Sequence, residues 1–540
     1  MTFLLVLLSC GRPPEVIPPA VVSPVASLPG PRLLRRISLD LRRVLPTVVE
    51  LDAVEEDAGN LLSERDAFLQ DPRLAERLVS MYAETFQTRM DLFEVTSISY
   101  RIPDDQNFAY VKSVGEEPLR LLAYVAQQDL PWTDTVTADY TVANEMLAEV
   151  WRLDYPEGAT GWQASRYVDG RPAAGVLATN GLWWRYVTNR SNLNRSRAAA
   201  MSKLLLCHDY LDRPVSFTSA STSLSDEEGI ALAIRTEPAC IGCHVSLDPL
   251  ASAMFGFYTV MAYNSDELDQ YHPEREPEGE SELGVAPSYF GTPIGGLADL
   301  GQQVAADPRF VTCATKTMAE QLWHRESTNE DFDRLESLRI AFEGSGLHMR
   351  ALVRAVTDSD VYRAGSLTDT ATEEEVSHEM TVRMLSPDQL QTVIEDLTGF
   401  RWTMDTYDVL ADDSTGYRVL AGGVDGDTVG SPQRDPGLTW ALVSKRLAEG
   451  AAGHAVEAEL VNGGERRLFT HVTLDTVPGD PDFTAELEDL HWRLFGIRAD
   501  TDALAADEAL WTAIAEQGGP AEAWKGLSSA LLRLPDFLGY

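Results

Sequence analysis

Residues 31–47 read PRLLRRISLDLRRVLPT, and this stretch indicates the type of fold. Its apolar side chains recur every three to four residues, the period of an amphipathic helix, at Leu34, Ile37, Leu41 and Leu45. Pro46 ends this helix, and Thr47 is a typical cap for the next one. The Arg residues of the stretch form a face that we expect to be solvated or ion-paired.

The same signals recur along the chain. Asp71 and Pro72 are typical of a helix start, and Ser386, Pro387 and Gly399 of a capped start and a glycine stop. Further helices are expected at 63–69, 142–155, 308–325, 337–341, 348–361 and 438–457, and a short strand at 467–474. We therefore expect a mainly α, multi-domain helical protein with a few short strands in its C-terminal part.

Composition divides the chain into five parts. Residues 1–10 read as a lipoprotein signal peptide, and residues 11–31 as a Pro-rich tether that spans on the order of 60 Å at about 3.1 Å per residue. A helical N-terminal domain is expected at 32–130, a cytochrome c-like region with a following helical domain at 131–375, and a mostly helical domain at 376–540. Similar stretches at 350–362 and 526–537 hint at a duplicated unit.

The N-terminus resembles a bacterial lipobox, Leu7-Leu-Ser-Cys10, in which Cys10 would become the lipidated first residue. The apolar run is short and no Lys or Arg precedes it, which favours a start further upstream. A frayed apolar N-terminus is the alternative. Gly11 favours the outer membrane under the sorting rule of some bacteria. Because no later stretch has the ~20 apolar residues of a membrane span, we expect a lipid-anchored body in the periplasm or at the cell surface.

The overall charge narrows the classes of partner. The chain has 540 residues, of which 44% are hydrophobic and 24% charged, and a formal net charge of −40. A surface this acidic argues against nucleic acid and against charge-driven binding to anionic lipid. It fits a cationic partner such as a basic redox protein, or adaptation to salty surroundings.

Residues 240–244 form a single C-x-x-C-H motif, in which two thiols lie one helical turn apart. This spacing suits covalent attachment of a c-type haem through Cys240 and Cys243, with His244 as an axial ligand of the iron. The alternatives are a Cys240–Cys243 disulfide and a haem-free relic of a haem site. A zinc site would require a second ligand pair, and the sequence has no second C-x-x-C and no H-x-x-x-H.

The remaining cysteines favour a disulfide. The chain has five, and once Cys10 carries lipid and the motif carries haem, Cys207 and Cys313 are left. In an oxidising compartment such a pair favours a bond, which would contribute about 4 kcal/mol by closing a loop of roughly a hundred residues. Two separate buried thiols are the alternative.

Arg190 and Arg195 lie in the polar stretch NRSNLNRSR, residues 189–197. Guanidinium groups bind carboxylates well, so these two side chains are candidate partners of haem propionates. The alternative is a polar loop in which Asn194 or Ser196 caps a helix that runs to Cys207.

These stretches resemble the domains of unknown function that accompany c-type cytochrome modules in planctomycetes and myxobacteria. Residues 32–47 resemble a domain with the opening Arg-Arg-x-x-Leu-Asp-Leu-x-x-x-x-Pro-Thr. Residues 171–258 are similar to a domain with a Leu-Leu-Cys element and the motif C-x-x-C-H-x-x-x-Asp-Pro, and residues 307–365 to the short helical domain that follows. The resemblance covers most of residues 32–365.

The resemblance implies haem attachment at Cys240 and Cys243 with His244 as ligand, and no characterised reaction. Where many relatives have Gly after Asp-Pro-Leu, this chain has Ala251, so the turn under the haem is expected to differ. The sixth ligand of the iron stays open among Met254, Met261, Met318, His208 and His324. The usual spacing in single-haem cytochromes favours Met318.

Three functions compete at this point. The leading hypothesis is a lipoprotein that carries one covalent haem c and passes electrons to an unnamed redox partner. The second is a haem-free scaffold or binding lipoprotein with a Cys240–Cys243 disulfide. The third is a haem enzyme such as a peroxidase, which would require an open sixth position. No triad, phosphate loop or H-E-x-x-H motif supports hydrolytic chemistry.

Overall fold

The computed structural model describes residues 25–89, 102–189, 191–212, 227–257, 270–367, 383–405, 407–412 and 415–540. The structure is 62% helical, and its strands form only short two-stranded pairs, which confirms the expected mainly α fold.

The helices and strands follow one another in three stretches of the chain. The first holds β1 (Val25–Ser27), α1 (Gly30–Arg42), α2 (Val48–Glu56), α3 (Asn60–Phe68), α4 (Arg73–Phe86), the 3-10 helix η2 (Asp104–Gln106) and α5 (Asn107–Gln127). The second holds α6 (Asp134–Thr137), β2 (Thr141–Ala143), α7 (Glu145–Trp151), β3 (Gln163–Ser165), η3 (Gly175–Ala178), α8 (Asn180–Arg185), α9 (Arg195–Leu206), α10 (Glu227–Thr236), α11 (Pro238–Ser252), η4 (Phe255–Phe257), η5 (Pro273–Arg275), α13 (Glu278–Leu283), β4 (Ser288–Tyr289), β5 (Thr292–Pro293), α14 (Leu297–Ala306), α15 (Pro308–Trp323), η6 (Asn329–Asp331), α16 (Phe332–Gly344), α17 (Met349–Asp358), α18 (Asp360–Arg363) and β6 (Ala364–Leu367). The third holds α20 (Pro387–Thr398), β7 (Thr403–Met404), β8 (Tyr407–Asp408), α21 (Tyr417–Leu420), α22 (Leu438–Ala455), the π-helical η8 (Val456–Val461), α23 (Pro481–Phe495), α24 (Thr501–Leu531) and α25 (Pro535–Leu538).

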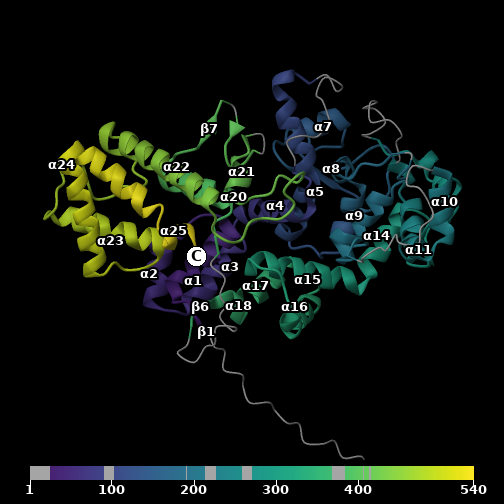
Figure 1. Cartoon of the computed structure of the whole chain (residues 1–540), viewed down its shortest axis with the longest axis horizontal. Coiled ribbons are helices and arrows are strands. Elements are labelled where there is room, and N and C mark those ends of the chain that lie inside the picture. Colours follow the sequence, from purple (N-terminus) through teal and green to yellow (C-terminus); the bar gives the residue numbers. More distant parts are fainter. Residues whose placement is uncertain are drawn as a thin grey trace, which may run out of the picture.

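These elements lie along one long axis. Figure 1 shows α22–α24 at one end, α9–α11 at the opposite end, and α1–α4 between them. The helix that carries the C-x-x-C-H motif is therefore remote from the C-terminal helices.

Local signals set several helix ends as expected. The Thr47 side chain accepts a hydrogen bond from the backbone N–H of Glu50, whose carboxylate binds the N–H of Thr47, so the two form a capping box at the start of α2. Ser386 and Gln389 form the same motif at the start of α20, and Gly399 ends that helix at a φ of 71°. A left-handed conformation of this kind suits glycine.

The strands differ from the expectation. Antiparallel pairs β1–β6, β2–β3, β4–β5 and β7–β8 are spread along the described chain and are not confined to its C-terminal part. Residues 467–474 are described, and they do not form the expected strand. Their backbone N–H groups bind buried carboxylates and not a neighbouring strand. Glu459 accepts the N–H groups of Leu468 and Phe469, and Glu486 those of Thr470 and His471.

The helix expected at 142–155 is shorter than predicted. Residues 141–143 pair with β3 as strand β2, and α7 begins only at Glu145 because the Asn144 side chain accepts the N–H of Leu147. The Asn side chain forms hydrogen bonds with nearby backbone groups. It therefore disfavours a helix that runs through this position and favours one that begins after it.

Two large cores meet at helix α1. Leu34, Ile37 and Leu41 belong to the main core, which extends over side chains of residues 33–362 and includes Trp492. Leu39 and Leu45 belong to the second core, which is built from residues 384–540. Since one helix contributes to both cores, α1 joins the C-terminal helices to the rest of the molecule.

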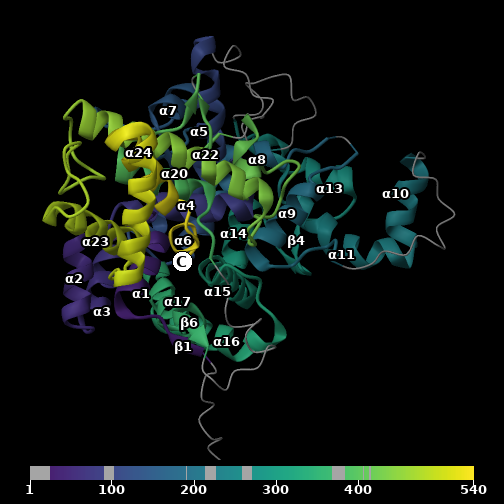
Figure 2. The ribbon, with the colours of Figure 1, turned by 60° about the vertical axis from the view of Figure 1, so that its left-hand side comes forward.

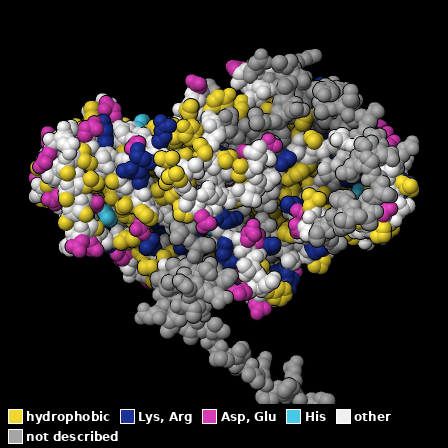
Figure 3. Space-filling model, in the orientation of Figure 1, with side chains coloured by type: hydrophobic (Ala, Val, Ile, Leu, Met, Phe, Trp, Pro, Cys, Tyr) yellow, Lys and Arg dark blue, Asp and Glu magenta, His cyan; other side chains and the backbone are white. Residues whose placement is uncertain are grey.

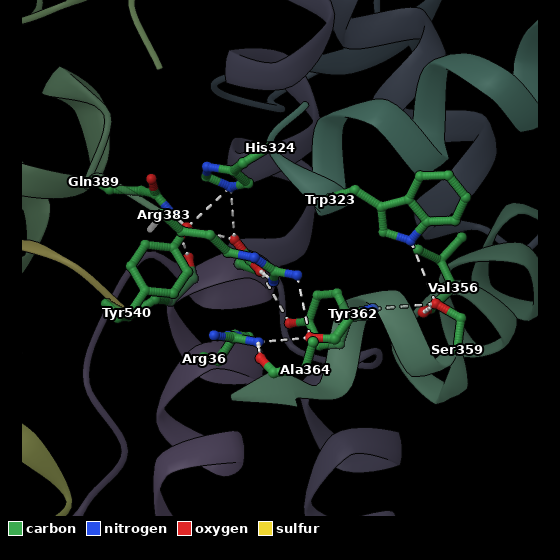
Figure 4. Close-up of polar contacts among 12 residues, drawn as sticks. Arg36, Trp323, His324, Val356, Ser359, Tyr362, Ala364, Arg383, Gln389 and Tyr540 are labelled. Carbon is green, nitrogen blue, oxygen red and sulfur yellow. Dashed lines mark hydrogen bonds and ion pairs between the residues drawn. The ribbon is translucent and has the colours of Figure 1, made fainter. Parts of the chain in front are cut away.

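Asp40, on α1, is the centre of a buried polar network, and Figure 4 labels its partners His324, Tyr362, Arg383 and Tyr540. Tyr540 donates to its Oδ1 at 2.6 Å and Tyr362 to its Oδ2 at 2.9 Å. His324 Nε2 lies 3.3 Å from Oδ1, and the Arg383 guanidinium donates to Oδ2 at 3.3 Å. These four partners come from positions up to 500 residues away in the chain, so a single carboxylate fixes the end of α15, α18 and the C-terminal segment on α1.

The electrostatics of the network keep Asp40 charged and His324 neutral. Burial alone would raise the pKa of Asp40, but the hydrogen bond from His324 and the charges of Arg383 and Arg77 hold it well below its usual range. Burial lowers the pKa of His324 to about 4, against the opposing effect of Asp40. A neutral imidazole therefore occupies this site near pH 7.

Arg35 and Arg36 of the opening stretch differ from the expectation of a solvated or ion-paired face, whereas Arg32 and Arg42 are ion-paired, with Asp536 and Glu50. Arg35 is 2% exposed and donates to the carbonyl oxygens of Leu494, Phe537 and Gly539. Arg36 donates to the carbonyls of Tyr362 and Ala364. Guanidinium groups present several donors in a fixed plane, and these two use them to satisfy backbone carbonyls of segments that are distant in sequence.

The state of His324 predicts a pH dependence of stability. The unfolded chain takes up a proton at residue 324 below pH about 6.5, whereas the folded protein does so only near pH about 4. The contribution of neutral His324 to the free energy of unfolding should therefore be fully present above pH about 6.5. It should decrease by about 3 kcal/mol as the pH drops to about 4. Urea unfolding of wild type and His324→Gln across this range measures the difference. Equal pH slopes for the two proteins would contradict the assignment.

Candidate functional site

Helix α11 carries the whole C-x-x-C-H motif. It follows Glu237, and Pro238 occupies its first turn, where a missing N–H costs nothing. At about 100° per residue, Cys240, Cys243 and His244 lie on one side of the helix. The motif is thus presented by one regular element, with its thiols one turn apart.

The two halves of α11 differ in burial. Residues 247–252 are buried against the body, whereas the N-terminal half and α10 project from it (Figure 2). Apolar side chains stay exposed on this projection: Val245 by 68%, Ile241 by 36% and Leu232 of α10 by 63%. Ile241 and Val245 each lie about 160° around α11 from Cys243, so both side chains face away from that thiol.

Both motif cysteines have free thiols in the structure. The Cys240–Cys243 disulfide of the alternative hypothesis is therefore not formed. Cys240 and Cys243 are half-buried, and the Cys243 sulfur lies 4.0 Å from the carbonyl oxygen of Tyr210. The two sulfurs are chemically available for thioether bonds.

His244 is oriented by an acidic partner one turn further along α11. Its Nδ1 lies 2.7 Å from Asp248 Oδ1, and Arg195 of α9 binds the same carboxylate through two hydrogen bonds of 2.7 and 3.0 Å. Burial alone would raise the pKa of Asp248, but the hydrogen bonds from His244 and Arg195 hold it below its usual value. A charged Asp248 places the imidazole proton on Nδ1 and leaves the Nε2 lone pair for a metal.

One of the two candidate propionate partners lies within the described residues. The Arg195 guanidinium binds Asp248 and thereby supports His244, and Arg190 lies outside the described residues. The polar loop does cap α9, although not as expected. Asn194 occupies the cap position in a left-handed conformation, and the Asn192 side chain accepts the N–H of Ser196.

A cavity of about 190 Å³ adjoins Cys243. Its walls come from α11, from the loop after α9, from the β4–β5 turn and from the start of α15, and consist of His208, Tyr210, Gly242, Cys243, Ser246, Phe290 and Arg309. This volume is below the roughly 300–1,000 Å³ of typical small-molecule sites. A haem would therefore occupy it only in part.

A disulfide holds one wall of this cavity. Cys207, at the end of α9, is bonded to Cys313 of α15, with Cα atoms 5.2 Å apart and a sequence separation of 106. This is the pair expected from the count of cysteines. The bond anchors the first residue of the loop that supplies His208 and Tyr210.

The candidate sixth ligands occupy different environments. Met318 and Met254 are each 1% exposed in the main core, and His324 belongs to the Asp40 network. Met261 lies outside the described residues. His208 lines the cavity beside Cys243, whereas the favoured Met318 points into the core from α15.

Sequence reasoning missed two features of the site. The first is the role of Asp248, for which its position four residues after His244 on a helix was an available signal. The second is the cavity itself, whose walls come from segments between 208 and 309. No local pattern relates those segments to one another.

Comparison with known proteins identifies no relative: no family model, curated protein or solved structure matches this chain. Within the described ranges, no three or more His, Cys, Asp or Glu side chains gather as a site for a metal ion. Among the described helices, none has the length and apolar character needed to cross a membrane.

The disulfide predicts a measurable loss of stability on removal. Closure of a loop of about 100 residues restricts the unfolded chain, and the cross-link therefore contributes about 4 kcal/mol. We expect Cys207→Ser/Cys313→Ser to unfold at clearly lower urea than wild type. Dithiothreitol-treated wild type should resemble the variant, since both lack the cross-link. Equal urea midpoints for oxidised and reduced wild type would contradict the prediction.

Proposed function

We propose that this protein is a lipid-anchored cytochrome that carries one haem c on helix α11 and transfers electrons. The observation that supports the proposal is the arrangement on α11: two free thiols one turn apart, followed by a histidine whose Nδ1 is held by Asp248. This donor set fits a c-type haem, because thiols form the covalent bonds and an imidazole with a free Nε2 is an axial ligand.

Each residue has a distinct task in this proposal. Cys240 and Cys243 would bond the macrocycle, and His244 would bind the iron through Nε2. Asp248 and Arg195 orient the imidazole, and the charged carboxylate would make its Nε2 a stronger electron donor to the iron. The bound haem would supply reversible one-electron transfer, and stronger donation by His244 favours the ferric form.

The position of α11 suits exchange of electrons with another protein. Its N-terminal half projects from the body, so a haem there would keep an accessible edge (Figure 2). Acidic side chains are spread over the face shown in Figure 3, and the formal net charge of the chain is −40. Long-range attraction therefore favours a basic redox partner over nucleic acid.

The lipid anchor is proposed from the sequence around Cys10, which lies outside the described residues. A lipidated Cys10 followed by a Pro-rich tether would hold the body near a membrane, with the periplasm or the cell surface as its compartment. Gly11 favours the outer membrane as the site of the anchor.

Haem attachment is tested with the full chain produced in a bacterium that has cytochrome c maturation. We expect a haem-stained band on a denaturing gel and a sharp α-peak on reduction. Both should be lost in Cys240→Ala/Cys243→Ala, which removes both thioether bonds, and retained in Cys207→Ser/Cys313→Ser, which alters two cysteines outside the motif. A haem-free protein with Cys240 and Cys243 joined in mass spectrometry would favour the scaffold hypothesis instead.

Lipidation is tested by fractionation of the same host. Wild type should be in the membrane fraction and enter the detergent phase, and Cys10→Ser should become water-soluble because it lacks the acylated thiol. Mass spectrometry of the N-terminal peptide should show the lipid on Cys10. Membrane association of both proteins to the same extent would contradict the anchor.

A further inference from the structure

The cavity beside Cys243 lies on a defined side of α11. At about 100° per residue, His244 is about 100° from Cys243 in one direction around the helix. Gly242 and Ser246, which line the cavity, are about 60–100° from Cys243 in the other direction. Cys243 therefore separates His244 from the cavity.

This order matters for a haem bonded to the cysteines. Thioether bonds hold the edge of the macrocycle at Cys240 and Cys243, and His244 approaches the iron from one face. A second protein ligand must approach from the opposite face. The residues that line the cavity lie on the other side of Cys243 from His244. Among the described residues, they are therefore the ones that face the position of a second ligand.

We infer that His208 is the second axial ligand of the haem iron, an inference that rests on the proposed haem attachment. Among the groups that line the cavity, His208 has the imidazole nitrogen that suits iron best. Of the other lining groups, Tyr210 offers a phenol hydroxyl and Arg309 a guanidinium, and neither provides the neutral nitrogen of an imidazole.

The surroundings hold the His208 ring in the cavity wall. Its ring centre lies 4.8 Å from that of Tyr210 and 6.0 Å from that of Phe290, and both contacts are edge-to-face. The neighbouring Cys207 is bonded to Cys313 of α15, and the His208 backbone N–H donates to the carbonyl of Ser202. The loop is thus fixed to two helices, so little conformational entropy would be lost on ligation.

Two histidine ligands have consequences that one histidine and a methionine would not have. The iron would be six-coordinate and low-spin with no open position, which favours electron transfer over peroxidase chemistry. Its potential would lie below that of a His/Met cytochrome, because a methionine ligand raises the potential. Met318, buried in the main core, would take no part.

The test uses the haem-loaded full chain and electron paramagnetic resonance of the ferric protein, with absorption spectra of both redox states. Wild type should give a low-spin signal of two histidine ligands. His208→Ala should lose it and become high-spin while keeping covalent haem, and added imidazole should restore the low-spin state. His208→Met should show the charge-transfer band of a Met–iron bond. His348→Ala, at the start of α17, is the matched control and should resemble wild type.

The outcomes separate the inference from the proposed function. A low-spin His208→Ala protein with wild-type signals would overturn the inference and leave haem attachment intact, as would a high-spin wild type. A wild type without covalent haem would overturn the proposed function, and the inference with it. Circular dichroism of each variant shows that it is folded, and imidazole rescue shows that only the ligand was lost.

Discussion

The structure depends on one buried carboxylate. Asp40 is fully enclosed and has partners at His324, Tyr362, Arg383 and Tyr540. A buried charge is tolerated only when its partners are complete, and loss of one partner of a buried pair typically costs about 3–5 kcal/mol. The two cores meet at the same helix, so the hydrophobic packing and the polar network enforce the same arrangement. The opening Arg-Arg-x-x-Leu-Asp motif is thus a structural element, because Arg35 and Arg36 bind carbonyls of the segments that Asp40 holds in place.

A similar device supports the candidate haem site at the other end of the molecule. Asp248 joins His244 of α11 to Arg195 of α9, and the Cys207–Cys313 bond joins the end of α9 to α15. Three helices distant in sequence are thereby fixed around Cys243 and its cavity. The N-terminal half of α11 is not packed in this way: its two thiols are half-buried, and Ile241 and Val245 are exposed to solvent. The support is rigid and the attachment surface is open, a combination that suits a covalently bound redox group with an accessible edge.

Much of the fold followed from local patterns. Helical spacing identified α1, although this helix ends at Arg42 and not at Pro46. Thr, Ser and Pro signals identified the start of α2 and all of α20, because these ends are set by bonds within a few residues. The strands were misplaced for the opposite reason. Residues 467–474 have strand-like composition, yet their N–H groups bind Glu459 and Glu486. Arg35 and Arg36 of α1 were misread because their carbonyl partners are more than 300 residues away.

The sequence by itself determined the chemistry available at the site: two thiols and an imidazole at helical spacing, an acidic chain, and a pair of cysteines left over for a disulfide. These properties depend only on residue type and short spacing, so they are the same in any fold in which residues 240–244 form a helix. Only the tertiary structure decided which groups surround that helix. It paired Arg195 with Asp248, buried Met318 in the core and placed His208 at the cavity beside Cys243. Contacts of this kind arise from packing between segments tens to hundreds of residues apart, and no local pattern encodes them.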